Sequence, residues 1–157
     1  MDHSQKQIVE EITKLLKGGN AHAGFEDAIK GLEPDLRGRV PANMPYSIWQ
    51  LIEHIRIAQW DMVAFSKDAK HVSPKWPDEY WVKESAPKDE ATWNNSIKQI
   101  AHDLDVFIDL LHHEDIYKKI PNGDGQSILS EALQIADHNA YHIAEIVALR
   151  RMMHAWK

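Results

Sequence analysis

Residues 127–155 read SILSEALQIADHNAYHIAEIVALRRMMHA, and their apolar side chains recur every three or four positions. This spacing places them on one face of an α-helix. Ser127 is the expected N-cap, because its hydroxyl can accept a hydrogen bond from a backbone N–H of the first turn. Arg150 and Arg151 stand near the other end, where positive charge complements the helix dipole. The stretch therefore predicts one long amphipathic helix.

Two histidines of this stretch, His138 and His142, are four residues apart, so they lie one turn apart on the same side of the helix. Together with Glu131 and Glu145 they form a polar column at the edge of the apolar face. Polar groups beside a core are costly unless they are paired, hydrated or bound to a ligand. Two imidazoles at this spacing can point their nitrogens at one metal ion, as in helical zinc sites. Two half-buried or surface histidines would produce the same pattern.

A third ligand has to come from another part of the chain, and His54 is the best candidate. It belongs to a predicted helix at about 47–67, which opens with the capping box formed by Ser47 and Gln50. His54 projects to the flank of the apolar stripe of this helix, near Asp61. The Asp61 carboxylate could orient an imidazole or a bound water, as carboxylates near metal sites often do. A solvated Asp61 and an ordinary histidine at a core boundary are the plain alternatives.

Three residues around the histidine pair have more than one interpretation. Tyr141 could donate a hydrogen bond to a bound substrate, but a packed ring with its hydroxyl at the surface is the favoured interpretation. Glu145 could be a base, an acceptor for a ligand histidine, or a solvated ion-pair partner. Asn139 projects into the apolar arc, so we expect a hydrogen bond to another helix.

The remaining aromatic residues and histidines are not expected to belong to the site. We assign the tryptophans no ligand role. The histidines that we expect to be solvated are His3, His22, His71 and His154.

The N-terminal half of the remaining sequence predicts helices at about 7–16 and 21–32, followed by a Pro- and Gly-containing connector at 33–45. Residues 68–87 contain three prolines and two tryptophans. A segment of this length without regular structure is usually functional or disordered, and its aromatic residues favour a packed loop.

The C-terminal half predicts a helix at about 88–114, with acidic residues in its first turn. PNGDG at 121–125 is a strong turn signal, and its flanks are expected to be helical rather than strands of a hairpin. No stretch alternates apolar and polar residues for long. The expected fold class is therefore all-α: a four-helix bundle with a long crossover connection between its second and third helices.

Composition suits one soluble domain spanning residues 1–157, with 43% apolar and 27% charged residues. The net charge of −6 and the lack of a Lys/Arg cluster argue against nucleic acid as a partner. Cysteine is absent, which excludes a disulfide framework, a metal site with cysteine ligands and a cysteine nucleophile, and which fits a reducing cytoplasm. No apolar run approaches the ~18 residues that indicate a membrane span, and the first residues lack the apolar region of a secretory signal. We expect a cytoplasmic protein.

Three stretches resemble the DinB/YfiT-like family of metalloenzymes, specifically its DinB-like branch. They are residues 47–65 (SIWQLIEHIRIAQWDMVAF), 73–81 (SPKWPDEYW) and 123–151 (GDGQSILSEALQIADHNAYHIAEIVALRR). With the helix order, the resemblance covers nearly the whole chain. It implies a four-helix bundle in which three histidines bind a divalent metal ion, commonly nickel or zinc. Carried over residue by residue, these ligands are His54, His138 and His142.

The resemblance also implies an activity. Some relatives are transferases or isomerases that use mycothiol, bacillithiol or glutathione, and relatives are often homodimers. The expectation is a metal-dependent enzyme acting on a small molecule, a thiol-dependent transferase or a hydrolase, with a low-molecular-weight thiol as a partner. Because no unambiguous acid or base residue stands out, the alternative is a non-catalytic bundle that binds a metal or forms a dimeric interaction module.

Overall fold

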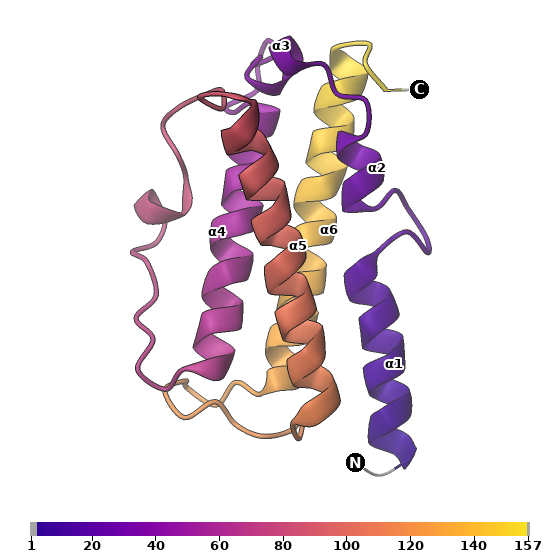
Figure 1. Cartoon of the computed structure of the whole chain (residues 1–157), viewed down its shortest axis with the longest axis vertical. Helices are drawn as coiled ribbons and strands as arrows, with labels where there is room; N and C mark the ends of the chain where they lie inside the picture. Colours follow the sequence, from indigo (N-terminus) through magenta and orange to yellow (C-terminus); the bar gives the residue numbers. More distant parts are fainter. Residues whose placement is uncertain (1–2, 157) are drawn as a thin grey trace.

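The computed structural model describes residues 3–156, and its regular secondary structure is helical. Four long helices form a bundle, as predicted (Figure 1). They are α1 (His3–Lys17), α4 (Ile48–Lys67), α5 (Glu90–His113) and α6 (Ile128–Met152). None of the described helices has the length and apolarity needed to cross a membrane.

Short elements occupy the segments between the long helices. They are α2 (Phe25–Ile29), α3 (Pro34–Arg37) and the 3₁₀ turn η1 (Asp78–Tyr80). The helix expected at 21–32 is therefore much shorter, because the backbone leaves the helical region at Lys30 and adopts a positive φ at Gly31. The connector expected at 33–45 contains one helical turn, α3, which begins at a proline, a residue whose φ suits a first helical position.

Both N-caps expected for α4 and α6 are present. Ser47 accepts a hydrogen bond from the backbone N of Gln50, and the Gln50 side chain accepts one from the backbone N of Ser47, at 3.2 and 3.1 Å. Ser127 accepts one from the backbone N of Ser130 at 3.2 Å. These caps fix where the two helices start, and therefore how far along each helix the histidines lie. At its other end α6 stops at Met152, short of the expected residue 155.

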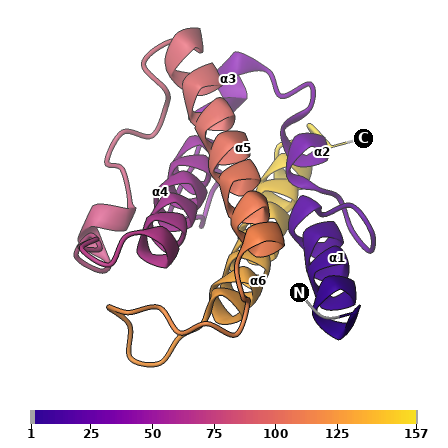
Figure 2. The same cartoon turned by 60° about the horizontal axis from the view of Figure 1, so that its bottom comes forward.

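The segment 68–89 connects the end of α4 to the start of α5, and α4 and α5 run in the same direction (Figure 1). It passes back along α4, where the Gln50 amide donates to the Val82 carbonyl at 3.1 Å and the Ser47 hydroxyl donates to the Ser85 carbonyl at 2.5 Å. Figure 2 shows it on the side of α4 away from α1. The expected packed loop is thus attached to the helix that carries His54.

The turn at 121–125 differs from the expectation for its flanks. Since α5 ends at His113 and α6 starts at Ile128, the residues on both sides of the turn are not helical. Lys119 and Ser127 instead form an isolated antiparallel bridge, beside a hydrogen bond from the Ile120 N–H to the Gln126 carbonyl at 2.9 Å. Turn chemistry overrides helix propensity here.

A polar layer divides the apolar core into two clusters. On α4 the first cluster ends at Ile55 and the second includes Val63; on α6 the second ends at Ile135 and the first resumes at Ile143. Between these limits lie buried polar side chains from three helices. They include Gln59, Asp61, Asp103 and His142. Buried polar groups need partners, so this layer is the part of the core that favours a binding site.

Candidate metal centre

Three imidazole rings converge at the edge of the polar layer, as the sequence predicts. His54 comes from α4, and His138 and His142 come from α6. The ring centroids are 4.9 Å apart for His54 and His138, 4.6 Å for His54 and His142, and 4.5 Å for the pair on α6. One nitrogen of each ring lies within 4.8 Å of the other two, close enough for all three to hold a metal ion.

The rings are largely withdrawn from solvent. His54 is 2% exposed and His142 is 8% exposed, while His138 is partly exposed. Burial lowers the pKa of His54, and it lowers the pKa of His138 to about 4, with the neighbouring His142 and His54 adding to the effect on His138. Both rings are therefore neutral at pH 7, which is the state that binds a metal ion.

Two of the rings have the hydrogen on Nδ1. His54 donates from Nδ1 to the backbone carbonyl of Tyr80 at 2.9 Å, and His142 donates from Nδ1 to the Glu145 carboxylate at 2.7 Å. Neither acceptor can donate, so in the neutral rings Nε2 has a free lone pair. Metal-binding histidines are held in this way in known sites, with the second ring nitrogen bonded to a carboxylate or a backbone carbonyl. The residues present therefore fit a bound cation.

Glu145 is the carboxylate that orients His142. Its other oxygen accepts a hydrogen bond from the Tyr46 hydroxyl, and its side chain is 20% exposed. Burial, reinforced by the Glu145 bond, raises the pKa of Tyr46, so the phenol remains a donor. Of the three interpretations open for Glu145, the geometry agrees with an acceptor for the histidine rather than a solvated ion-pair partner.

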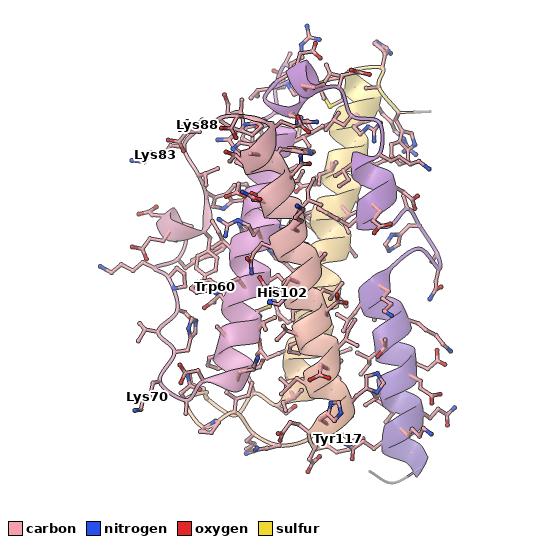
Figure 3. The ribbon with its side chains drawn as sticks, viewed as in Figure 1. Trp60, Lys70, Lys83, Lys88, His102 and Tyr117 are labelled. Atoms are coloured by element: carbon pink, nitrogen blue, oxygen red, sulfur yellow. The ribbon has the colours of Figure 1, made fainter. Side chains whose placement is uncertain are left out.

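Asp61 also orients an imidazole, but the ring belongs to His71. Its carboxylate lies 2.6 Å from His71 Nε2 and accepts from the Tyr80 hydroxyl at 2.5 Å. The expectation of a solvated His71 is wrong, because the segment 68–89 folds back on α4 and leaves the His71 side chain 10% exposed, with its ring centroid 5.4 Å from that of Trp60. Figure 3 shows Trp60 on the side of α4 that faces this segment. Asp61 thus holds η1 in place, and η1 supplies the carbonyl that binds His54.

The other histidines expected to be solvated divide as follows. His22 and His154 are exposed, as expected. The side chain of His3 lies outside the described residues. His71 differs from His22 and His154 because the segment 68–89 packs against α4, and the local sequence does not indicate this packing.

Aromatic rings surround the centre. Trp81 stacks on His54 with centroids 3.9 Å apart and an interplanar angle of 6°. Trp76 is 71% exposed and lies 6.4 Å from the His54 ring. Tyr141 is 63% exposed, so its ring is less packed than expected, and the ring meets that of His142 edge-to-face with centroids 5.0 Å apart. The contact between Trp81 and His54 was not foreseen, since the two residues belong to different segments.

Fold and site together define a helical bundle with three histidines placed to hold a metal ion. The family model of the DinB superfamily matches residues 20–146, which is most of the chain, and the protein belongs to this superfamily. The matched range contains the three histidines and Glu145, and it excludes α1. No curated protein and no solved structure matches the chain.

Proposed function

We propose that His54, His138 and His142 bind a divalent metal ion, zinc or nickel, and that the protein is a metal-dependent enzyme acting on a small molecule. The observation that carries the proposal is the convergence of three imidazole nitrogens within 4.8 Å. Three protein ligands leave coordination positions open, as in catalytic zinc sites. Imidazole ligands suit zinc, nickel, copper and iron alike. We propose zinc or nickel because the family that the sequence resembles commonly binds these two.

The chemistry proposed is transfer or hydrolysis assisted by the metal, with a low-molecular-weight thiol as a reactant. A dication held by neutral imidazoles keeps its full charge and lowers the pKa of a coordinated water or thiol. Other residues of the chain orient the ligand rings: the Tyr80 carbonyl accepts a hydrogen bond from His54, and the Glu145 carboxylate accepts one from His142. Trp76 and Tyr141 are exposed beside the centre and offer aromatic surface to the apolar part of a substrate.

Metal analysis of protein purified without an affinity tag tests the proposal. We expect one zinc or nickel ion per chain, and loss of that ion in His138→Ala. The matched control is His102→Ala, because His102 is exposed on α5 (Figure 3) and does not belong to the group of three histidines. Wild-type protein that binds neither metal would contradict the proposal.

The second candidate is a non-catalytic metal-binding bundle, and the burial of two candidate ligands favours it. Cobalt-substituted protein separates the two. A change in the visible spectrum on adding azide or glutathione indicates an open coordination position and supports an enzyme. A spectrum unchanged by either, with no thiol-dependent turnover, supports the non-catalytic bundle.

The homodimer is a separate part of the proposal and rests on the resemblance alone. Light scattering of the metal-loaded protein tests it. A mass of twice the 18.1 kDa chain supports the dimer, and a monomeric mass contradicts it.

A further inference from the structure

A pocket of about 550 Å³ lies where α1 and α2 cover α5 and α6. Figures 1 and 2 show α1 and α2 on the other side of the bundle from the segment 68–89, which covers the candidate metal centre. Gln59 and Asn139 line the pocket, whereas the three candidate metal ligands are not part of its described walls. The pocket is therefore a separate feature, and its volume is that of a small-molecule site.

The break between α1 and α2 opens this pocket. Gly18 and Gly19 have φ angles of 70° and 85°, which end α1 in a conformation that favours glycine. The chain then bulges away from α5 and α6 before α2 begins at Phe25 (Figure 1). The lining residues of α5 and α6 include three alanines, Ala101, Ala136 and Ala140. Because these side chains are small, the space that the bulge leaves is not filled from below.

The inner end of the pocket is polar. Gln59 has no exposed surface, so it lies deep in the pocket. Its amide nitrogen donates to the backbone carbonyl of Ile100 at 2.7 Å, and its oxygen accepts from the Asn139 amide nitrogen at 2.8 Å. Since a carbonyl can only accept, these contacts fix which end of each amide is the nitrogen.

Each of these amide nitrogens has a second hydrogen to donate. Among the described residues, Gln59 Nε2 donates to Ile100 alone and Asn139 Nδ2 donates to Gln59 alone. One N–H of each amide therefore has no acceptor within the described chain. A buried donor without an acceptor is unfavourable, so an oxygen atom of a bound molecule would be stabilised at this end of the pocket.

The wall between the inner end and the mouth is apolar. It includes Phe25, Ile97, Leu104 and Ile143. Ile143 is 8% exposed, and the other three are partly buried. Small-molecule sites typically combine such a wall with a few polar groups that fix the orientation of the ligand. The body of the ligand is therefore expected to be apolar.

The exposed lining residues at the mouth carry more acidic than basic groups. Glu26, Asp27 and Asp105 are carboxylates, and they stand beside Lys17 and His22. Solvent screens exposed charges, but an excess of carboxylates still disfavours the approach of an anion. An apolar wall also disfavours the burial of a charge without a partner. Both effects favour a neutral ligand.

We propose that this pocket binds a small apolar molecule with a neutral carbonyl group, whose oxygen accepts hydrogen bonds from Gln59 and Asn139. The apolar body contacts the wall, and the mouth discriminates against a carboxylate of the same shape. The proposal is independent of the metal ion. A protein that binds no metal would contradict the proposed function and leave this pocket unaffected.

Nuclear magnetic resonance titration of the metal-free protein with three molecules of similar shape tests the proposal. Acetophenone has the carbonyl, ethylbenzene has a methylene group in its place, and benzoate has a carboxylate. The assigned side-chain amide signals of Gln59 and Asn139 report on the inner end of the pocket. We expect saturable shifts with acetophenone, and dissociation constants at least about threefold larger for ethylbenzene and for benzoate.

Variants that fill the pocket show whether these shifts arise from binding within it. Ala101→Phe fills it from α5 and Ala140→Phe fills it from α6, and each should abolish saturable binding of acetophenone. Ala91→Phe is the matched control, because Ala91 and Ala101 are both exposed on α5 but Ala91 does not line the pocket. Thermal unfolding checks that each variant is folded.

Acetophenone binding that is retained in Ala91→Phe and lost in a folded pocket-filling variant supports the proposal. The proposal is overturned if acetophenone causes no saturable shift of the two side-chain amides. It is also overturned if ethylbenzene or benzoate binds as tightly as acetophenone, since the amides would then not select a neutral carbonyl. Equal acetophenone affinity in Ala101→Phe and Ala91→Phe would place the binding outside this pocket and overturn it as well.

Discussion

His54 donates a hydrogen bond to the backbone carbonyl of Tyr80, although the two residues are 26 positions apart in the sequence. The Tyr80 hydroxyl in turn donates to Asp61, two turns further along the helix that carries His54. Tyr80 therefore connects two points of α4 through one residue of the connecting segment. The orientation of a candidate metal ligand depends on the packing of this segment.

Removing the Tyr80 hydroxyl should weaken this connection. In Tyr80→Phe the buried Asp61 carboxylate loses a donor, so we expect the free energy of unfolding to fall by about 1–3 kcal/mol. Zinc affinity should fall as well, because η1 holds the His54 ring less firmly. Urea unfolding and chelator competition measure the two effects. Tyr117→Phe is the control, since Tyr117 is 54% exposed (Figure 3), and equal stability of the two variants would contradict this role of Tyr80.

Glu145→Gln should reduce metal affinity about 10–100-fold, because a neutral amide is a weaker acceptor for His142 Nδ1 than a carboxylate and makes the ring a poorer ligand. Tyr46→Phe removes only the bond that holds Glu145 and should have a smaller effect. Glu84→Gln, at an exposed position, controls for the change in net charge. Isothermal titration with zinc measures all three. An unchanged affinity in Glu145→Gln would show that His142 needs no carboxylate partner.

The metal-free protein should lose stability as the pH falls from 6.5 towards 4. Burial lowers the pKa of His138 to about 4, whereas an unfolded histidine has a pKa near 6.5. Between these values the unfolded chain binds more protons than the folded chain, so the free energy of unfolding rises with pH. His54, whose pKa burial also lowers, acts in the same direction. Urea unfolding across this range measures the slope.

The comparison that isolates this effect is between wild type and His138→Gln. Burial raises the pKa of Glu131 and of Asp103, and both carboxyls act in the opposite direction at the acid end of the range. They are present in both proteins, so the difference in slope belongs to His138. We expect a shallower slope in His138→Gln, and parallel curves would contradict the assignment.

Two adjacent arginines at the end of α6 should differ in their effect on stability. Arg150 is 5% exposed and donates to the Ala28 carbonyl at 2.7 Å and to the Ala155 carbonyl at 2.8 and 3.0 Å. Arg150→Met leaves these carbonyls without their donor and should cost about 2–3 kcal/mol. Arg151 is exposed, so Arg151→Met should change stability by less than about 0.5 kcal/mol. Equal effects in denaturant unfolding would show that the buried contacts are unimportant.

The sequence predicts those parts of the site that depend on helical spacing. His138 and His142 follow from a four-residue interval, and the caps at Ser47 and Ser127 follow from residue type at a helix start. Once the helices are antiparallel neighbours, His54 is the histidine that α4 can bring to the pair. The bond from Asn139 to another helix was predicted for the same reason, because a polar side chain in an apolar arc needs a partner.

The parts that the sequence does not predict depend on the segment 68–89. It has no hydrophobic period, so nothing local indicates that His71 binds Asp61 or that Trp81 stacks on His54. Arg150 shows the same limit within a helix. Its charge at the end of α6 was predicted to complement the dipole, yet its contacts are to carbonyls of α2 and of the C-terminal residues.

The division of the core into two apolar clusters has a mechanical consequence. Each cluster contains residues of α4 and of α6, and polar side-chain contacts also join the two helices, from His138 to His54 and from Asn139 to Gln59. A cation bound by one ring from α4 and two from α6 would act there as a cross-link between antiparallel helices. The proposed metal would then brace the bundle through the polar side chains that the two helices share.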